Sequence, residues 1–212
     1  MADMEALSGF LQKGKAKEVR ELTQQAVDDG MKPEEILDQG LLAGMNVIGL
    51  KFKNNEVFVP EVLIAARAMN AGMEILKPLL AAANMHDRGT VVIGTVKGDL
   101  HDIGKNLVGM MMKGKGLQVI DLGTDVAPKR FVEEAVAHHA QIIACSALLT
   151  TTMKEMEQVV KAVRDADLHG TVKVMIGGAP VTESFRNTIG ADRYTSDAAT
   201  AAEVALELCS GR

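Results

Sequence analysis

The sequence predicts an α/β protein in which an N-terminal bundle of four helices precedes a doubly wound parallel-sheet domain. Over residues 1 to about 83, apolar residues recur three and four positions apart, the spacing of amphipathic helices. From residue 90, short apolar runs alternate with helical patterns, which is the order that produces a parallel sheet covered on both faces. We therefore expect a helical domain over residues 1–88 and a sheet domain over residues 89–212.

Four segments carry the helical pattern, at residues 4–13, 16–30, 32–54 and 59–83. Gly30 follows the second segment as a C-terminal cap would, and Pro33 and Pro60 stand where a first helical turn tolerates proline. Short turns between the segments indicate an antiparallel bundle. The periodicity is lost at residues 84–90, which we interpret as the linker between the domains.

The second half contains four strand-like apolar runs and a weaker fifth, at residues 91–96, 117–123, 141–147, 172–179 and 193–196. Helical patterns between and after these runs are expected to begin near Ile103, Pro128, Thr152 and Thr182, with a final helix over residues 197–210. Right-handed crossovers then place every strand parallel to its neighbours.

Composition excludes several classes of protein. The 212 residues include 23 Lys and Arg against 28 Asp and Glu, a formal net charge of −5, so no basic surface is expected for nucleic acid. Cys145 and Cys209 form no CxxC motif and are expected to be reduced thiols. No apolar run approaches the roughly 20 residues that span a bilayer. We expect a soluble, cytoplasmic protein without membrane or nucleic-acid partners.

Three loops at the carboxyl ends of the predicted strands have unusual chemistry: "GDLHDIGK" from residue 98, "SALLTTTM" from residue 146, and "GGAP" from residue 177. Ligands of parallel sheets bind beyond these strand ends. Each loop also has a simple structural explanation, as a surface histidine, as helix caps, or as a tight turn. The sequence has neither a P-loop nor a dinucleotide-binding glycine motif.

His101 follows Asp99 by two residues, which supplies a neutral nitrogen ligand and a carboxylate that can orient it. A single histidine cannot hold a bare zinc ion, because zinc takes about four ligands. One histidine is sufficient when a macrocycle already supplies the in-plane ligands of the metal. This pattern favours a macrocyclic metal cofactor.

These motifs resemble the signature of the cobalamin-binding fold, a Rossmann-like (flavodoxin-like) domain. They are D-x-H-x-x-G at residues 99–104, S-x-L at 146–148 and G-G at 177–178. Residues 57–69, "VFVPEVLIAARAM", also resemble the helical cap that precedes this fold in methyl-transferring corrinoid proteins. The chain is similar to the corrinoid proteins that serve methyltransferases for methanol, methylamines, betaines or aryl ethers. It is more distantly similar to the cobalamin-binding region of methionine synthase.

The resemblance implies a role for each residue of the first loop. His101 would be the lower axial ligand of the cobalt in a cobalamin or related cobamide, bound base-off and His-on. Asp99 would accept the other imidazole N–H, and Thr152 would complete an axial-ligand relay in which methionine synthase has serine. Ile103 and Gly104 would lie against the cofactor. Asp102 belongs to the same binding motif, but like Lys105 it is expected to be solvated or to cap the helix.

The displaced nucleotide tail of the cofactor would enter a slot in the sheet domain. Gly177 and Gly178 would leave room for it, so Gly178→Leu would block binding with the fold intact. Ser146 and Thr150 would offer hydrogen bonds, beside Leu148 of the same motif. On the upper face of the ring, the candidate roof residues are Phe58, Met69 and Met73, whose alternative role is ordinary bundle core.

The function implied is that of a methyl-group carrier in one-carbon metabolism of anaerobic type, without catalysis by the chain alone. A substrate-specific methyltransferase would methylate the Co(I) form, and a second methyltransferase would pass the methyl group to a folate, pterin or thiol acceptor. A reductive-activation protein would be a third partner. Two alternatives share the three loops: the cobalamin-binding subunit of an adenosylcobalamin-dependent mutase, and a cobalamin-dependent sensor.

Overall fold

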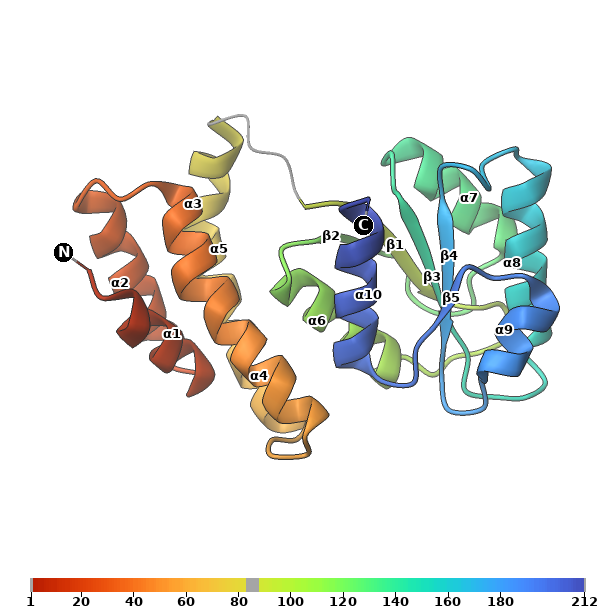
Figure 1. Ribbon diagram of the computed structural model, residues 1–212, viewed down its shortest axis with the longest axis horizontal. Coiled ribbons are helices and arrows are strands. Elements are labelled where there is room, and N and C mark those ends of the chain that lie inside the picture. The colour runs from red at the N-terminus through yellow and green to blue at the C-terminus, as the bar shows by residue number, and fades with distance from the viewer. Residues whose placement is uncertain (1, 83–87, 212) are drawn as a thin grey trace. The chain divides into compact units, whose positions relative to one another are not determined.

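The structure, a computed structural model, describes residues 2–82 and 88–211 (Figure 1). The chain divides into two compact units, one formed by the N-terminal helices with residues 114–116, and one formed by the rest from Arg88 onward. Most of the predicted linker, residues 84–87, lies outside the described residues. No helix in the described ranges is long and apolar enough to cross a membrane.

The helices of the first unit follow the predicted pattern closely. They are α1 (Met4–Gln12), α2 (Ala16–Asp28), α3 (Pro33–Glu35), a π-helical segment η1 (Ile36–Leu42), α4 (Ala43–Lys53) and α5 (Val59–Ala82). The third predicted helix is one continuous run, α3–η1–α4, and its π-helical middle was not predicted. There Gly40 is buried so closely against Leu7 that a Cβ atom would collide with the leucine side chain.

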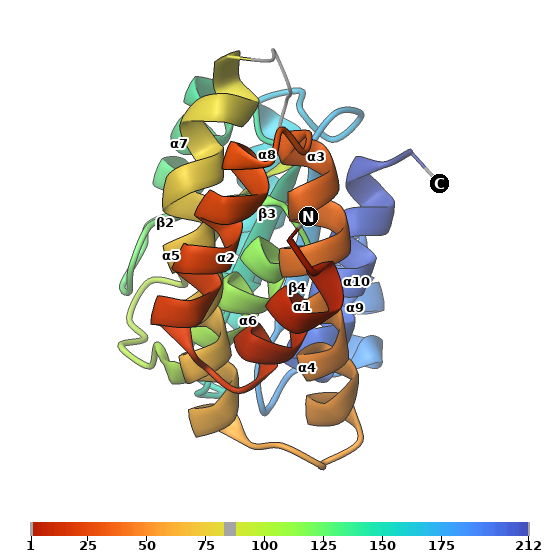
Figure 2. The same ribbon diagram turned by 90° about the vertical axis from the view of Figure 1, so that its left-hand side faces the viewer.

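The apolar faces of these helices are buried against one another, with α2 and α5 in extensive contact and α1 packed on η1 and α4 (Figure 2). Fully buried side chains of this core come from all the long helices and from η1: Leu7, Leu11, Val19, Ile36, Leu41, Ile48 and Leu76. Removing this surface from water is the main stabilising contribution to the bundle, since short helices are marginal alone.

The second unit is a five-stranded parallel sheet in the order β2-β1-β3-β4-β5, which confirms the predicted fold class. Its strands are β1 (Thr90–Thr95), β2 (Gln118–Asp121), β3 (Ile142–Ser146), β4 (Lys173–Gly177) and β5 (Arg193–Tyr194). In β1 every residue is buried, as expected for a strand covered on both faces.

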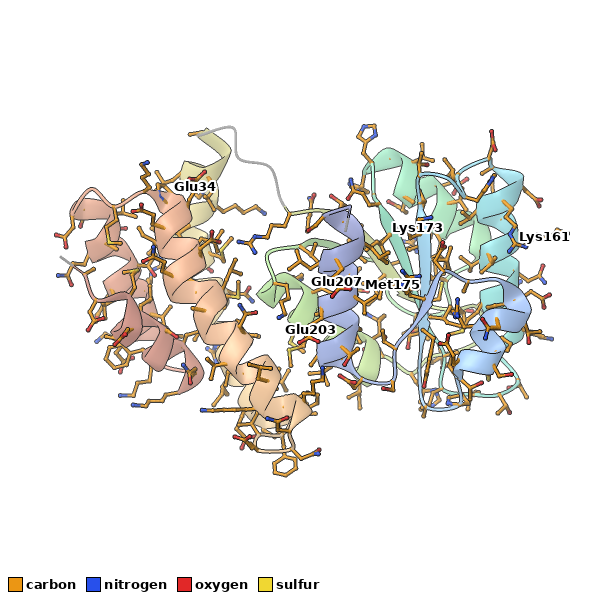
Figure 3. All side chains as sticks on the ribbon, in the orientation of Figure 1. Glu34, Lys161, Lys173, Met175, Glu203 and Glu207 are labelled. Carbon is orange, nitrogen blue, oxygen red and sulfur yellow. The ribbon has the colours of Figure 1, made fainter. Side chains whose placement is uncertain are left out.

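Helices α6 (Ile103–Gly114) and α10 (Ala198–Cys209) cover one face of the sheet, and α7 (Pro128–Ala137), α8 (Lys154–Asp165) and α9 (Glu183–Ile189) cover the other (Figure 1). Lys161 on α8 and Glu207 on α10 accordingly lie on opposite sides of the sheet, with Met175 of β4 between them (Figure 3). Phe131, Ile143 and Met156 are fully buried in the core beneath α7 and α8.

The strand order reverses between β1 and β3, because the chain passes from β1 outward to β2 and then returns to β3. The loops after β1 and β3 therefore leave the sheet in different directions, and ligands of such sheets bind in the crevice between them. This topology brings the loop of Asp99 next to the loop of Thr152, although 53 positions separate the two residues.

Gly178 has a structural function that the sequence did not reveal. Its φ is +132°, and a Cβ atom there would lie 1.9 Å from the carbonyl oxygen of Ala147. The prediction that Gly178→Leu leaves the fold intact is therefore corrected, because any side chain at 178 meets the backbone of the β3–α8 loop. Gly177 is less constrained, since its Cβ would lie 3.3 Å from the Thr195 carbonyl oxygen.

We predict that Gly178→Ala lowers the free energy of unfolding of the ligand-free protein by about 2–4 kcal/mol, through the steric contact and the unfavourable φ. Urea denaturation measures this loss. Gly170→Ala is the matched control, because no described residue has an atom within 4 Å of its Cβ position. Equal stability of the two variants would contradict the assigned contact.

Candidate functional site

Asp99 is the centre of the site. Its side chain is fully buried, and its carboxylate accepts five hydrogen bonds. Oδ1 accepts from the backbone N–H of His101 at 3.1 Å and from His101 Nδ1 at 2.8 Å. Oδ2 accepts from the N–H groups of Leu148 and Leu149 at 2.8 and 3.2 Å, and from Thr152 Oγ1 at 2.8 Å. One carboxylate thus joins the β1–α6 loop to the β3–α8 loop.

These hydrogen bonds determine the pKa of Asp99. Burial by itself would raise the pKa of the carboxyl, because it disfavours the charged form. The N–H groups of Leu148 and His101, the His101 ring and the Thr152 hydroxyl outweigh burial and hold the pKa of Asp99 well below its usual range. The group is therefore a carboxylate at neutral pH, and it accepts rather than donates toward His101.

The imidazole of His101 is oriented by this carboxylate and is half exposed, at 50% of its side-chain surface. Since Asp99 is ionised, Oδ1 accepts the proton on Nδ1, which leaves Nε2 as the ring nitrogen that faces no carboxylate. Within residues 2–82 and 88–211, Nε2 has no hydrogen-bond partner. The same part of the chain holds no cluster of three metal-ligating side chains. His101 thus offers one nitrogen that no group in the described part of the chain occupies.

The surface around His101 is apolar and exposed. Leu100 and Ile103 are 73% and 76% exposed, and Leu148 and Leu149 of the neighbouring loop are also exposed. Gly104 adds open space, because beyond its own helix no atom of residues 2–82 and 88–211 lies within 4 Å of its Cβ position. An imidazole set among exposed leucine and isoleucine side chains fits the underside of a flat macrocycle that needs one axial ligand, so the donor set fits a corrinoid.

The residues expected to hold the nucleotide tail lie at the ends of β3 and β4. Ser146 ends β3 and is partly buried, Thr150 is exposed, and in the described part of the chain neither hydroxyl makes a hydrogen bond. Gly177 is partly buried beside Thr195. These residues lie in two adjacent loops, which is compatible with the predicted slot and leaves its occupancy a prediction.

Lys105 differs from its prediction. It is buried, and its Nζ lies 2.6 Å from both carboxylate oxygens of Asp121 and from Oδ1 of Asn106. The expectation of a solvated or capping lysine is therefore wrong, because β2 places Asp121 beside the start of α6. Asp102 is exposed and bonds with the Asn106 side chain at 2.9 Å, as a residue at a helix start can.

The three candidate roof residues have different environments. Phe58 is 64% exposed, Met73 is partly buried, and Met69 is buried. The alternative role as ordinary core therefore suits Met69. Phe58 remains available to a ligand.

Sequence reasoning missed Thr95, which is fully buried at the end of β1 and donates its hydroxyl to the carbonyl oxygen of His101 at 2.8 Å. A polar residue within the apolar run of β1 was the only signal. It also missed the N–H group of Leu149, since backbone donors leave no sequence pattern.

We predict that the buried carboxylate makes stability pH-dependent in a defined direction. The folded pKa of Asp99 is lowered, so its stabilising contribution is complete above the unfolded value of about 3.9 and is lost as pH falls toward the folded value. Asp99→Asn removes this titration. In urea denaturation of the ligand-free proteins, the free energy of unfolding of wild type should be well above that of Asp99→Asn at pH 7. The difference between these two free energies should narrow below about pH 4. A difference independent of pH would contradict the assignment.

Comparison with known proteins identifies the family. A family model described as a B12 binding domain matches residues 89–207, and a second with the same description matches residues 4–77. The chain is 44% identical over 180 residues to trimethylamine corrinoid protein 1 of Methanosarcina mazei, covering 84% of this chain and 83% of the relative. It is 44% identical over 179 residues to dimethylamine corrinoid protein 1 of Methanosarcina acetivorans, covering 84% of each.

The fold also matches a solved structure over nearly the whole chain. The methanol:cobalamin methyltransferase complex MtaBC from Methanosarcina barkeri superposes with a TM-score of 0.88 and 29% identity, over 97% of this chain and 79% of the matched chain. The two ranges matched by the family models, residues 4–77 and 89–207, lie in the two units of the chain. The chain therefore belongs to the cobalamin-binding corrinoid proteins of the methylamine and methanol methyltransferase systems.

Proposed function

We propose that this protein is a methyl-group carrier that binds a cobamide base-off with His101 as the lower axial ligand. The observation that carries the proposal is the geometry of His101: Nδ1 bonds to the buried Asp99 carboxylate at 2.8 Å, while Nε2 is unpartnered in the described ranges and lies among exposed apolar side chains. When bound, the corrinoid supplies a cobalt centre that can accept and release a methyl group.

The protein's own contribution is to place and tune the nitrogen ligand. Asp99 fixes the imidazole tautomer and makes Nε2 a better donor, because the carboxylate stabilises positive charge on the ring. Thr152 holds the second carboxylate oxygen and completes the relay. Leu100, Ile103 and Leu148 would exclude water from beneath a bound ring, and the open space at Gly104 would let the ring approach the backbone.

The nucleotide tail would lie along the carboxyl ends of β3 and β4. Ser146 and Thr150 bring hydroxyl groups that the rest of the described chain leaves unbonded, and these suit the polar atoms of a nucleotide. Gly177 borders the same space. Phe58 of the helical region would contribute to the upper face, with Met73 as a second candidate.

Two relatives and one solved structure support the class of methyl donor and the kind of partner. The trimethylamine and dimethylamine corrinoid proteins are equally similar to this chain, and the matched methanol complex is a methyltransferase complex. We propose that a substrate-specific methyltransferase binds the donor, and that a second methyltransferase holds the acceptor, a folate, pterin or thiol. A reductive-activation protein would restore the carrier after oxidation.

His101→Ala tests the lower ligand. After reconstitution with hydroxocobalamin and reduction to cob(II)alamin, wild type should show nitrogen hyperfine splitting from the imidazole in its EPR spectrum. His101→Ala should retain most of the bound cofactor, through the tail slot, and lose this splitting. His169→Ala is the matched control, because His169 is an exposed histidine near α8. An unchanged spectrum in His101→Ala would exclude His101 as the ligand.

The carrier function is tested by reconstituting the protein with hydroxocobalamin and offering it each candidate partner with its donor. With trimethylamine, dimethylamine or methanol methyltransferase and a reductant, we expect stoichiometric methylation by one partner, seen in the absorption spectrum. The holo-protein alone should demethylate none of these donors. Multiple turnovers by the isolated chain would refute the carrier function.

A further inference from the structure

The loop that carries Asp99 and His101 is held from two sides, because β1 lies between β3 and β2 in the sheet. The side toward β3 supplies the donors to the Asp99 carboxylate described above. The side toward β2 contacts the backbone of the same loop, through residues that follow β2.

Asp125 makes the contact on the β2 side. Its Oδ1 accepts the N–H of Gly98 at 2.7 Å, and its own N–H donates to the carbonyl oxygen of Asp99 at 3.0 Å. Asp125 therefore binds the two consecutive residues that lead into the Asp99–His101 pair. The next residue, Val126, continues the pairing of the two loops by bonding to Thr95 and bridging to Val96.

The residue type at position 125 is restricted by its backbone. Asp125 has a φ of +54°, the left-handed region that aspartate, asparagine and glycine tolerate best. Of these three, only aspartate and asparagine also bring an oxygen that can accept the Gly98 N–H. Gly98 itself has a φ of +80°, so the loop reaches Asp125 through a conformation that favours glycine.

The position of the imidazole depends on this backbone. Asp99 Oδ1 bonds at once to the N–H and to Nδ1 of His101, so the ring direction follows the place of Asp99 relative to residue 101. The Thr95 hydroxyl donates a hydrogen bond to the carbonyl oxygen of His101. A shift of the backbone at residues 98–99 therefore changes the direction of Nε2 without removing any atom of the relay.

We propose that Asp125 is a positioning residue for His101, which fixes the loop backbone so that Nε2 points at the axial site. This inference rests on the proposed function of His101. Asp125 acts through its two hydrogen bonds to Gly98 and Asp99, and its negative charge is not required.

The test compares three variants. Asp125→Asn keeps both the accepting oxygen and the tolerance of positive φ. Asp125→Gly keeps the φ and removes the acceptor, and Asp125→Ala removes the acceptor and adds strain. Asp167→Ala is the matched control for strain, because Asp167 has a φ of +55° and lies after α8. All four proteins and wild type are checked for folding by circular dichroism.

The first measurement is the ratio of His-on to His-off cob(II)alamin at neutral pH, from the nitrogen splitting in the EPR spectrum. We expect Asp125→Asn and Asp167→Ala to stay within about twofold of wild type. Asp125→Gly should lower the ratio about tenfold, consistent with the loss of one hydrogen bond, and Asp125→Ala at least as much. A wild-type ratio in Asp125→Gly overturns the proposal. An equal loss in Asp125→Asn also overturns it, since the charge would then be the cause.

The second measurement uses the cofactor-free protein and separates this inference from the proposed function. Amide hydrogen exchange should be faster at Gly98 and His101 in Asp125→Gly than in wild type or Asp125→Asn. If wild type itself shows no His-on signal, the proposed ligand role of His101 fails, and the exchange result still tests the loop. Unchanged exchange at both amides in Asp125→Gly overturns the positioning role.

Discussion

The site depends on one buried charge. A carboxylate removed from water is costly unless hydrogen bonds replace its hydration, and Asp99 obtains five donors from His101, Leu148, Leu149 and Thr152. Three of those donors come from residues about 50 positions further along the chain. The buried charge of Asp99 is therefore stabilised only when the β1–α6 and β3–α8 loops are both in place, and the orientation of His101 follows from the same condition.

The parallel sheet satisfies this condition through strand order. With β1 between β2 and β3, its loop has a neighbour on each side, and each neighbour contacts a different part of it. The β3 side binds the Asp99 side chain, and the β2 side binds the backbone at Gly98 and Asp99 through Asp125. Gly178, which follows β4, also packs closely on a neighbouring loop. Only a residue without a Cβ atom lets the loop after β4 pass the Ala147 carbonyl. Close backbone packing thus supports the site from three strands.

The surface around His101 is apolar and exposed, in contrast to the closely packed loops that support it. Leu100 and Ile103 expose most of their apolar atoms, which is unfavourable in water and is typical of a surface that binds a ligand. Covering these side chains with a macrocycle would gain hydrophobic free energy, while the single polar contact at Nε2 would set the position of the metal. In the proposed function, affinity and chemistry would depend on different atoms: the leucine and isoleucine side chains would hold the ring, and the Asp99–His101 pair would tune the ligand.

The sequence by itself determined the fold class, the helices and strands to within a few residues, and the family, since periodicity and motif spacing are local properties of the chain. It also predicted the Asp99–His101 contact, because only one residue separates the two. Tertiary structure alone decided the pairing of Lys105 with Asp121, the burial of Met69, the close approach of Gly178 to Ala147, and the hydrogen bonds of Thr95 and Asp125. These contacts depend on the order and register of strands that a single sequence does not display. The physical reason is that a hydrogen bond or a steric contact between distant residues has no period and leaves no pattern along the chain.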